Sequence, residues 1–299
     1  MSVNIPDHFI TSYTTNVAHL LQIKGGKLRS KVTESSYSGE AAAAVDQYGA
    51  VEMQEVVGRF APMGRVDAEV DRRWVYPVDY ELPQMVDTFD KLRLMTDPQG
   101  ALAQAAVMGA QRKMDRLIFA AFFADAKTGK NGGTTENFDT TNHRVDAAIG
   151  ASADTGLNAD KILRAKRIMQ LANVDFEVDG RPTLAITPYQ EENLLQQAQV
   201  TNTDFFNVGG RPILVDGKIS QWCGVDIIVS NLVPSNSSYR LLPMWVQNGM
   251  HLGVWSDVSA RVDIRADISG TPYQLYSKMT VGATRLEPGR VIQIECTEA

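Results

Sequence analysis

Histidine and cysteine are scarce in this chain, and their scarcity argues against several common kinds of chemistry. The 299 residues include only 4 His and 2 Cys. The histidines are His8, His19, His143 and His251, and no two of them are spaced as in H-E-x-x-H, so the sequence carries no zinc motif. Cys223 and Cys296 are far apart and form no C-x-x-C motif, so we expect two free thiols and no structural zinc or redox pair.

Long apolar runs and a dominant charge sign are also missing. The apolar stretch 117–124 is far shorter than the roughly 20 residues that a membrane-spanning helix needs. Met1 to Ile10 lack the basic region followed by an apolar region that is typical of a secretory signal. We therefore expect a protein that is made in the cytoplasm and has no membrane partner. Lys and Arg number 29 against 35 Asp and Glu, which gives a net charge of −6 with both signs well mixed. This balance argues against a protein that grips nucleic-acid phosphates.

Fingerprints of nucleotide-binding and hydrolytic enzymes are absent too. Gly129-Lys130 suggests a phosphate-binding loop, but Ala124 and Asn131 occupy the positions where that motif needs Gly and Ser or Thr. No G-x-G-x-x-G and no G-x-S-x-G occurs. We predict no catalytic residue, no cofactor and no metal site, although an enzyme of an unrecognised class stays open as an alternative.

The composition of the whole chain is ordinary for a soluble folded protein, with 44% hydrophobic and 21% charged residues. Its length suggests two domains at roughly 150 residues each. Residues 1–27 read as an arm with a short amphipathic element that ends at Gly25-Gly26. The apolar residues of this element recur at three- and four-residue spacing: Phe9, Tyr13, Val17, Leu20 and Leu21.

Residues 28–84 predict extended strands and long polar turns, with too few apolar residues to form a core. Such a segment is expected to pack on something else, and its interleaved charges suit contact with a charged protein partner. The candidate contact residues are Arg59, Arg65, Arg72, Arg73, Trp74, Glu52, Glu55, Asp67 and Glu69.

One long helix is predicted next, over 98–127. Asp97-Pro98 supplies an N-cap and a first-turn proline, and Gly129 follows the helix as a stop signal. The apolar face of this helix comprises Val107, Ala110, Met114, Leu117, Ile118 and Ala121. Its length, about 45 Å at 1.5 Å per residue, exceeds that of an ordinary core helix.

Alternating helices and strands are predicted for the remainder. A helix follows Asn158, a strand covers 183–186, and Thr187-Pro188-Tyr189-Gln190 predicts a third helix that begins with a capping box. Further strands are predicted at 212–215, 225–229, 239–242 and 250–254, with a tight turn at Asp216-Gly217. The chain closes with a pair of long strands, 273–285 and 290–296, joined at 286–289.

Several local motifs in this order resemble the major capsid proteins of tailed bacteriophages, which share the HK-ninety-seven-like capsid fold. The motifs are Lys24 to Arg29, Asp97-Pro98-Gln99, Asp115 to Ala121, Gln221 to Ser230, Lys278 to Arg285 and Val291 to Cys296. The resemblance implies an α+β subunit with an N-terminal arm at 1–27 and an extended β-hairpin loop at 28–84. It also implies a peripheral domain at 85–157 and 256–299, with its spine helix at 98–127, and an axial domain at 158–255.

Assembly is the function that the resemblance implies. Such subunits form pentamers and hexamers of an icosahedral shell around double-stranded DNA, which would place this chain in a virion made in a bacterial host. The resemblance implies other copies and a portal as partners, with scaffolding or decoration proteins as further candidates. Because the arm starts almost at Met1, it implies either a separate scaffolding protein or none. No lysine–asparagine crosslink between subunits is expected, since its partner residues cannot be placed. An encapsulin-like nanocompartment, which encloses a cargo enzyme instead of DNA, is the nearest alternative.

Overall fold

Helices and sheets alternate through the part of the chain that the computed structural model describes, which is residue 23 and the ranges 25–55, 58, 64–86, 99–197, 214–215 and 218–298. The helices are α2 (Gln99–Phe123), α3 (Ala159–Leu171) and α4 (Pro188–Leu195), with short 3₁₀ turns η1 (Arg29–Lys31), η3 (Gln247–Gly249) and η4 (Pro288–Arg290). The strands are β1 (Thr33–Ser36), β2 (Ala42–Tyr48), β3 (Val70–Val75), β4 (Val78–Val86), β5 (Ala126–Thr128), β6 (Thr134–Glu136), β7 (Arg144–Val145), β8 (Thr183–Ile186), β9 (Leu214–Val215), β10 (Lys218–Ile219), β11 (Gln221–Trp222), β12 (Val225–Val229), β13 (Arg240–Trp245), β14 (Met250–Ile264), β15 (Tyr273–Arg285) and β16 (Val291–Cys296). The α+β class predicted from the sequence is confirmed.

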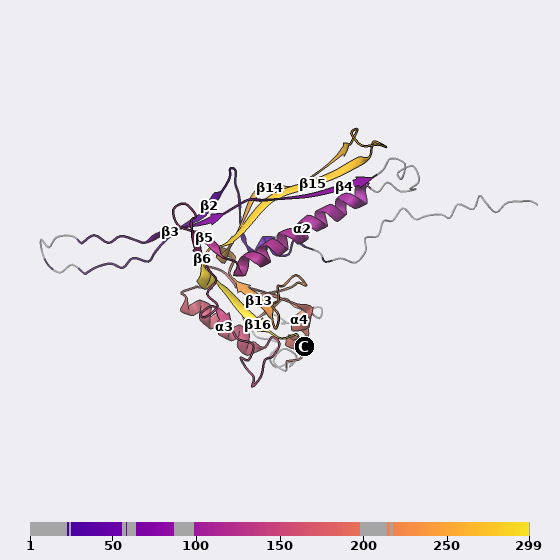
Figure 1. The fold of residues 1–299 in the computed structure, drawn as a ribbon. Coiled ribbons are helices and arrows are strands. Elements are labelled where there is room, and N and C mark those ends of the chain that lie inside the picture. The colour runs from indigo at the N-terminus through magenta and orange to yellow at the C-terminus, as the bar shows by residue number, and fades with distance from the viewer. Residues whose placement is uncertain are drawn as a thin grey trace, which may run out of the picture.

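The long helix α2 runs along one face of a four-stranded sheet with the order β1-β14-β15-β4 (Figure 1). Leu275, Met279 and Val281 alternate along β15 and are buried, as the two-residue period of a strand requires when one face is covered. Met114 and Phe122 are buried on α2. This packing joins the helix and the sheet into one apolar layer.

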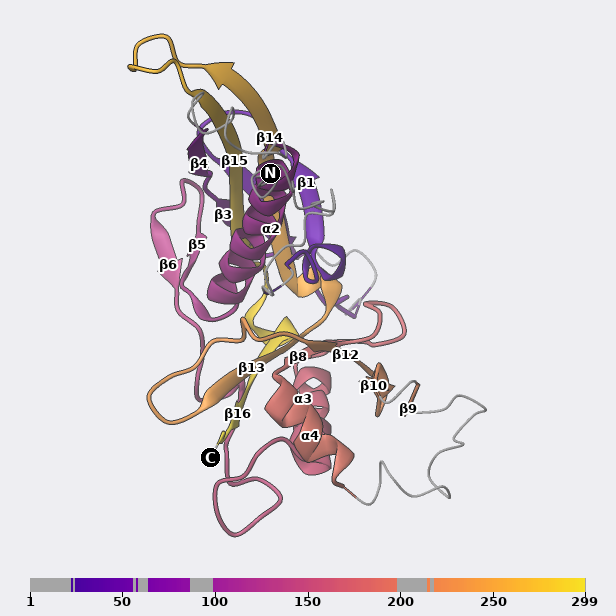
Figure 2. The ribbon, with the colours of Figure 1, turned by 90° about the vertical axis from the view of Figure 1, so that its right-hand side faces the viewer.

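A second, six-stranded sheet has the order β11-β12-β8-β13-β16-β7, and α3 and α4 lie beside it (Figure 2). Two of its interior strands, β8 and β16, are buried along their whole length. The two layers share one core, because the ring of Trp245 on β13 lies 4.6 Å from that of Phe122 on α2.

The last two strands were expected as a pair, and the structure corrects this. β15 pairs with β14 and β4, whereas β16 pairs with β13 and β7 in the other sheet. The turn η4 redirects the chain between them, and its Pro288 lacks the N–H that would continue a ladder. The closing strands therefore connect the two layers.

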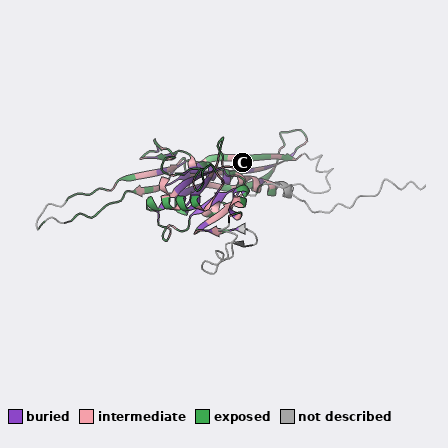
Figure 3. Cartoon of the chain, turned by 90° about the horizontal axis from the view of Figure 1, so that it is seen from below, coloured by how far each residue is buried: buried purple, intermediate pink, exposed green. Residues whose placement is uncertain are grey.

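A third sheet, β2-β3-β5-β6, forms the base of a projecting hairpin. β2 and β3 pair antiparallel, and the chain between them extends away from both layers (Figure 1). Buried residues gather in the centre of the molecule, while the described part of this projection is exposed (Figure 3). The prediction of an extended segment over 28–84 that does not bury itself holds only between β2 and β3. Its two ends, β1 and β4, join the four-stranded sheet, and Leu28 and Val32 are buried in the core because β14, β15 and α2 cover them.

The predicted helices are found, with two corrections to the long helix. α2 ends at Phe123 and not at 127, because 126–128 pairs with β3 as β5. Val107 is 40% exposed and does not belong to the buried face. Asp97-Pro98 lies outside the described residues. None of the described helices combines the length and the apolar character that crossing a bilayer demands.

The two helices in the second half of the chain begin at the capping residues that the sequence predicted. The side chain of Asn158 caps α3 by accepting a hydrogen bond from the Lys161 N–H, and Thr187 caps α4 by accepting from the Gln190 N–H. The reciprocal bond of a capping box is not formed, because the Gln190 side chain donates to the Thr297 carbonyl and accepts from the Leu157 N–H. A buried tertiary contact has taken the place of the local one.

Strand predictions are confirmed at 183–186, 225–229 and 273–285, and β14 continues ten residues beyond its predicted end, from 254 to 264. The turn Asp216-Gly217 lies outside the described residues, although β9 and β10 on either side of it pair antiparallel. Cys223 and Cys296 are both free thiols, as predicted.

Candidate intersubunit surface

The projecting hairpin is built from an antiparallel pair whose charged side chains face each other. Asp46 on β2 lies opposite Arg72 on β3, and the Arg72 guanidinium donates to both carboxylate oxygens at 2.5 and 3.2 Å. Hydrogen bonds from Arg72 lower the pKa of Asp46 below its ordinary value. The Gly49 N–H donates to the Glu69 carbonyl at 2.6 Å and continues the pairing beyond the strands. The backbone pairing of β2 with β3 therefore continues to the point where the two arms of the hairpin begin to project from the subunit.

Trp74 fastens the base of the hairpin to the neighbouring turn. Its indole N–H donates to the Gly129 carbonyl at 2.7 Å, and the Gly129 N–H donates to the Asp71 carboxylate at 3.0 Å. Arg72 lies over the indole ring, 5.8 Å from its centroid. Trp74 is thus held within its own subunit and keeps only part of its surface free for a neighbour.

Arg73 points inward and has a different role from the other candidates. It is 4% exposed, and its guanidinium pairs with the carboxylate of Glu136 on β6. Two of its nitrogens, Nε and Nη1, have no partner among the described residues. Because it is covered by its own chain, Arg73 stabilises the hairpin base and offers no surface to another copy.

Arg285 completes this buried basic cluster and was not identified from the sequence. It is 1% exposed at the end of β15, and its Nη1 donates to the carbonyls of Phe122 and Ala124 at 2.9 and 3.0 Å. Burial lowers the pKa of its guanidinium. The C-terminal end of a helix has unpaired carbonyls and a partial negative charge, so a buried cation satisfies both.

The arms of the hairpin carry exposed charges and exposed apolar side chains together. Arg65 pairs with Asp67 at 2.8 Å, with both side chains largely in solvent. Glu52, Glu55 and Glu69 form no ion pair with any described residue. The exposed apolar side chains of this surface are Tyr48, Val51, Met53, Val66 and Val70, and Met53 is fully exposed.

The structure thus separates the predicted contact residues into two groups. Arg72, Arg73 and Trp74 lie at the base of the hairpin, where Asp46, Gly129 and Glu136 of the same chain engage them. The exposed residues on the arms are Glu52, Glu55, Arg65, Asp67 and Glu69. Arg59 lies outside the described residues. The partners at the base could not be predicted, because Gly129 and Glu136 are remote in sequence.

A second anchor missed by the sequence holds the start of the described chain against α2. The buried carboxylate of Asp115 accepts hydrogen bonds from the backbone N–H groups of Lys27 and Leu28, each at 3.3 Å. Burial raises the pKa of this carboxyl group. A lone Asp on the apolar side of a predicted helix was the only available sign of this contact.

Among the described residues, no group of three or more His, Cys, Asp or Glu side chains could hold a metal ion. His143 is half-buried and His251 is buried, and burial lowers the pKa of both imidazoles. Burial also raises the pKa of the Cys296 thiol to about 12.

Comparison with known proteins agrees with this reading of the fold. The family model described as "Phage capsid protein" matches residues 5–298. No curated protein matches. The chain resembles the capsid of cyanophage P-SCSP1u with a TM-score of 0.74 at 14% identity, covering 98% of this chain and 94% of that one.

Two further solved structures give the same result. The capsid of Ralstonia phage GP4 matches with a TM-score of 0.72 at 12% identity, covering 98% of this chain and 96% of that one. The Mycobacterium phage Che8 structure matches with a TM-score of 0.70 at 13% identity, covering 97% and 98%. The chain belongs to the phage capsid protein family: it has the HK-ninety-seven-like fold and a structural role in the virion.

Proposed function

We propose that this chain is the major capsid subunit that assembles with copies of itself into pentamers and hexamers of an icosahedral shell. The observation that carries the proposal is the β2–β3 hairpin, which projects from the subunit with Met53, Val51 and Tyr48 unburied (Figure 1). Contiguous exposed apolar side chains rimmed by charges are typical of protein interfaces. A neighbouring copy would cover them in a shell.

We further propose that the shell encloses double-stranded DNA without sequence-specific binding, and that a portal and scaffolding or decoration proteins complete it. The net charge of −6 supports this, since an acidic wall repels phosphate and lets DNA pack without adhering. In this proposal the layer around α2 is the peripheral domain, the layer around α3 and α4 is the axial domain, and synthesis takes place in the bacterial host.

Expression of the full chain followed by gradient sedimentation and negative-stain microscopy tests the assembly. We expect closed shells or capsomers, and nucleic-acid analysis of particles from infected cells should recover double-stranded DNA. A small species that never forms shells or capsomers, at any concentration or with candidate scaffolding proteins, would contradict the proposal. Particles that hold a cargo enzyme in place of DNA would indicate a nanocompartment.

The hairpin's part in assembly is tested by reversing its acidic charges. Glu52→Lys with Glu55→Lys should lower the yield of shells at least tenfold, while the melting temperature of the unassembled chain stays unchanged because both side chains are exposed. The matched control is Glu177→Lys with Glu192→Lys, which changes the net charge equally at exposed sites on the other layer. Wild-type yield from the hairpin variant would show that these glutamates make no essential contact.

A further inference from the structure

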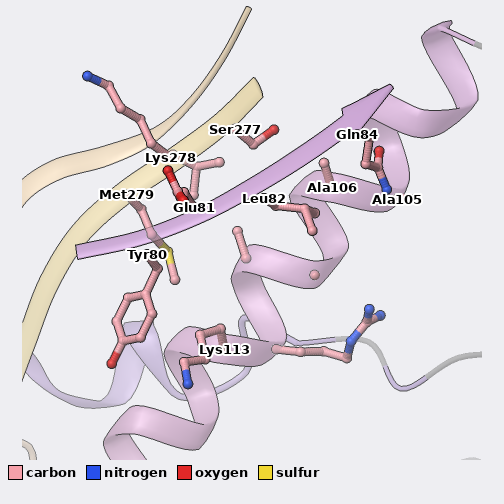
Figure 4. Close-up of a pocket in the computed structure, with 14 residues that line it drawn as sticks. Tyr80, Glu81, Leu82, Gln84, Ala105, Ala106, Lys113, Ser277, Lys278 and Met279 are labelled. Carbon is pink, nitrogen blue, oxygen red and sulfur yellow. The ribbon is translucent and has the colours of Figure 1, made fainter. Parts of the chain in front are cut away.

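Two cavities of the described subunit have similar volumes, about 460 Å³ each, but they differ in charge. One is a groove between α2 and strands β4 and β15 (Figure 4). The charged residues that line this groove have both signs, and they are Glu81, Arg112, Lys113 and Lys278. Its mixed charges and its apolar wall do not select an ion of either sign.

The other cavity lies between α3 and residues 141–144, which lead into β7. Its charged side chains are Arg144 on β7 and Arg164 and Arg167 on α3, and none of the described residues that line it is Asp or Glu. We call this space the basic cavity. A concave site that is lined by one sign of charge concentrates ions of the opposite sign. In a chain whose net charge is −6, the basic cavity is a local exception that favours an anion.

The two arginines on α3 are the unpaired cations of this cavity. Arg164 and Arg167 lie three residues apart on the helix, so they share one face, and both are exposed. Neither forms an ion pair or a hydrogen bond with any described residue. Arg144 differs, because it pairs with Asp146 at 2.7 Å and lies 3.7 Å from the Glu295 carboxylate. The cavity therefore offers two free guanidinium groups beside a third that already has partners.

Hydrogen bonds within the chain hold the loop side of the basic cavity in place. The Asp139 carboxylate accepts from the backbone N–H groups of Thr141 and Asn142 at 2.8 and 3.1 Å, and from the Asn142 side chain at 2.7 Å. The His143 carbonyl accepts from the Gln293 N–H on β16 at 2.9 Å. This wall is thus formed before any ligand arrives, which lowers the cost of binding.

We propose that the basic cavity binds phosphate groups through Arg164 and Arg167. A terminal phosphate carries about −1.5 to −2 charges at pH 7, and two adjacent phosphodiesters carry about −2, so either matches two free guanidinium groups. Phosphate oxygens also accept the paired N–H groups of an arginine fork. A single carboxylate would leave one of the two cations unmatched. The cavity is larger than one phosphate group, and Ile168 and Leu171 give it an apolar side that suits an organic part of the ligand.

This site goes beyond the shell-forming function and does not depend on it, because the basic cavity lies beside α3 and not on the projecting hairpin. The phosphate groups could come from a free polyphosphate compound or from the backbone of DNA. A contact to phosphate carries no sequence information, so DNA bound here would still be bound without sequence specificity.

Calorimetric titration of the purified full chain with sodium tripolyphosphate tests the site at fixed ionic strength. We expect saturable binding, and Arg164→Gln with Arg167→Gln should weaken it at least tenfold because both free cations are removed. The matched control is Lys113→Gln with Lys278→Gln, which removes the same charge from the groove beside α2 and should leave binding unchanged. Equal weakening in both variants, or no saturable binding to the wild-type chain, would overturn the proposal.

Two further ligands identify the source of the phosphate. A short DNA duplex that binds with the same dependence on Arg164 and Arg167 would identify DNA as the source. A duplex that does not bind, beside tripolyphosphate that does, would identify a free phosphate compound. An oligoglutamate peptide that binds more tightly than tripolyphosphate would overturn the proposal in favour of an acidic protein partner.

Arginine footprinting of the wild-type chain gives a check that needs no variant to fold. Phenylglyoxal modifies accessible guanidinium groups, and the modified residues are mapped by mass spectrometry. We expect tripolyphosphate to slow the modification of Arg164 and Arg167 severalfold, since a bound phosphate covers their N–H groups. Arg261, which is exposed on β14, should react at an unchanged rate. Equal protection of all three arginines, or protection of none, would contradict the proposed site.

Discussion

The guanidinium of Arg285 lies 2.9 Å from the carbonyl oxygen of Phe122, so the end of β15 caps the end of α2. Both residues are essentially buried. The long helix thus ends on a side chain supplied from far along the sequence. The base of the projecting hairpin meets the same point through Arg73 and Glu136, because Arg285 also donates to the Glu136 carbonyl at 3.4 Å.

Removal of this cap should destabilise the subunit. Arg285→Met leaves the carbonyls of Phe122 and Ala124 buried without a donor, and we expect the free energy of unfolding to fall by about 2–4 kcal/mol. The measurement is the urea midpoint of the unassembled chain. Arg261→Met is the control, since Arg261 is exposed on β14, and it should change the free energy by less than about 0.5 kcal/mol. Equal stability of the two variants would contradict the capping role.

Gln190 should matter more than its place on a short helix suggests. Gln190→Met keeps the volume but removes the acceptor of the Leu157 N–H at 2.6 Å and the donor to the Thr297 carbonyl at 2.9 Å. We expect a loss of about 2–3 kcal/mol in the free energy of unfolding. Gln196→Met, at the exposed end of the same helix, should have little effect. A Gln190 variant as stable as this control would show that the two backbone groups find other partners.

Mild acid should weaken the fold through its buried histidines. Burial lowers the pKa of His251 and His143 below the ordinary 6.5, so the unfolded chain binds more protons as the pH falls below that value. Stability should therefore fall as the pH drops from 7.5 toward 5.5. His251→Gln, which can keep the hydrogen bond to Tyr37, should reduce the slope in urea titrations, and adding His143→Gln should reduce it further. An unchanged slope in the double variant would assign the effect to other groups.

The thiol of Cys296 should be inert in the native subunit. It is fully buried and burial raises its pKa to about 12, so almost no reactive thiolate exists at pH 8. Labelling with a chromogenic disulfide should modify Cys296 only as the chain unfolds. The half-buried Cys223 serves as the internal comparison, and we expect it to react first. Rapid native labelling of Cys296 would indicate that β16 opens locally.

Local signals predicted those elements whose conformation depends on nearby residues. Asn158 and Thr187 cap their helices as their positions indicate, and the alternation along 273–285 marks a strand with one covered face. These features extend over a few residues, so the sequence contains all the required information. The exposed, charged hairpin was predictable for the same reason, because a segment with little apolar surface cannot bury itself.

Contacts between remote segments were not predictable in this way. The sequence indicated strands at 273–285 and 290–296, but their separation into two sheets depends on η4 and on partners from elsewhere in the chain. The truncation of α2 at Phe123 likewise follows from the pairing of β5 with β3, which overrides helix propensity.

By itself, then, the sequence determined the α+β class, the caps at Asn158 and Thr187, the exposed character of the segment between β2 and β3, and the absence of recognisable catalytic motifs. Only the tertiary structure decided that Arg73 and Arg285 are buried and bind groups of their own chain. It also decided that Asp115 binds the backbone at the start of the described chain, and that Ser277 and Gln84 line a groove beside α2. The physical reason is that burial and hydrogen-bond pairing depend on which distant segments meet, and local periodicity does not specify that meeting.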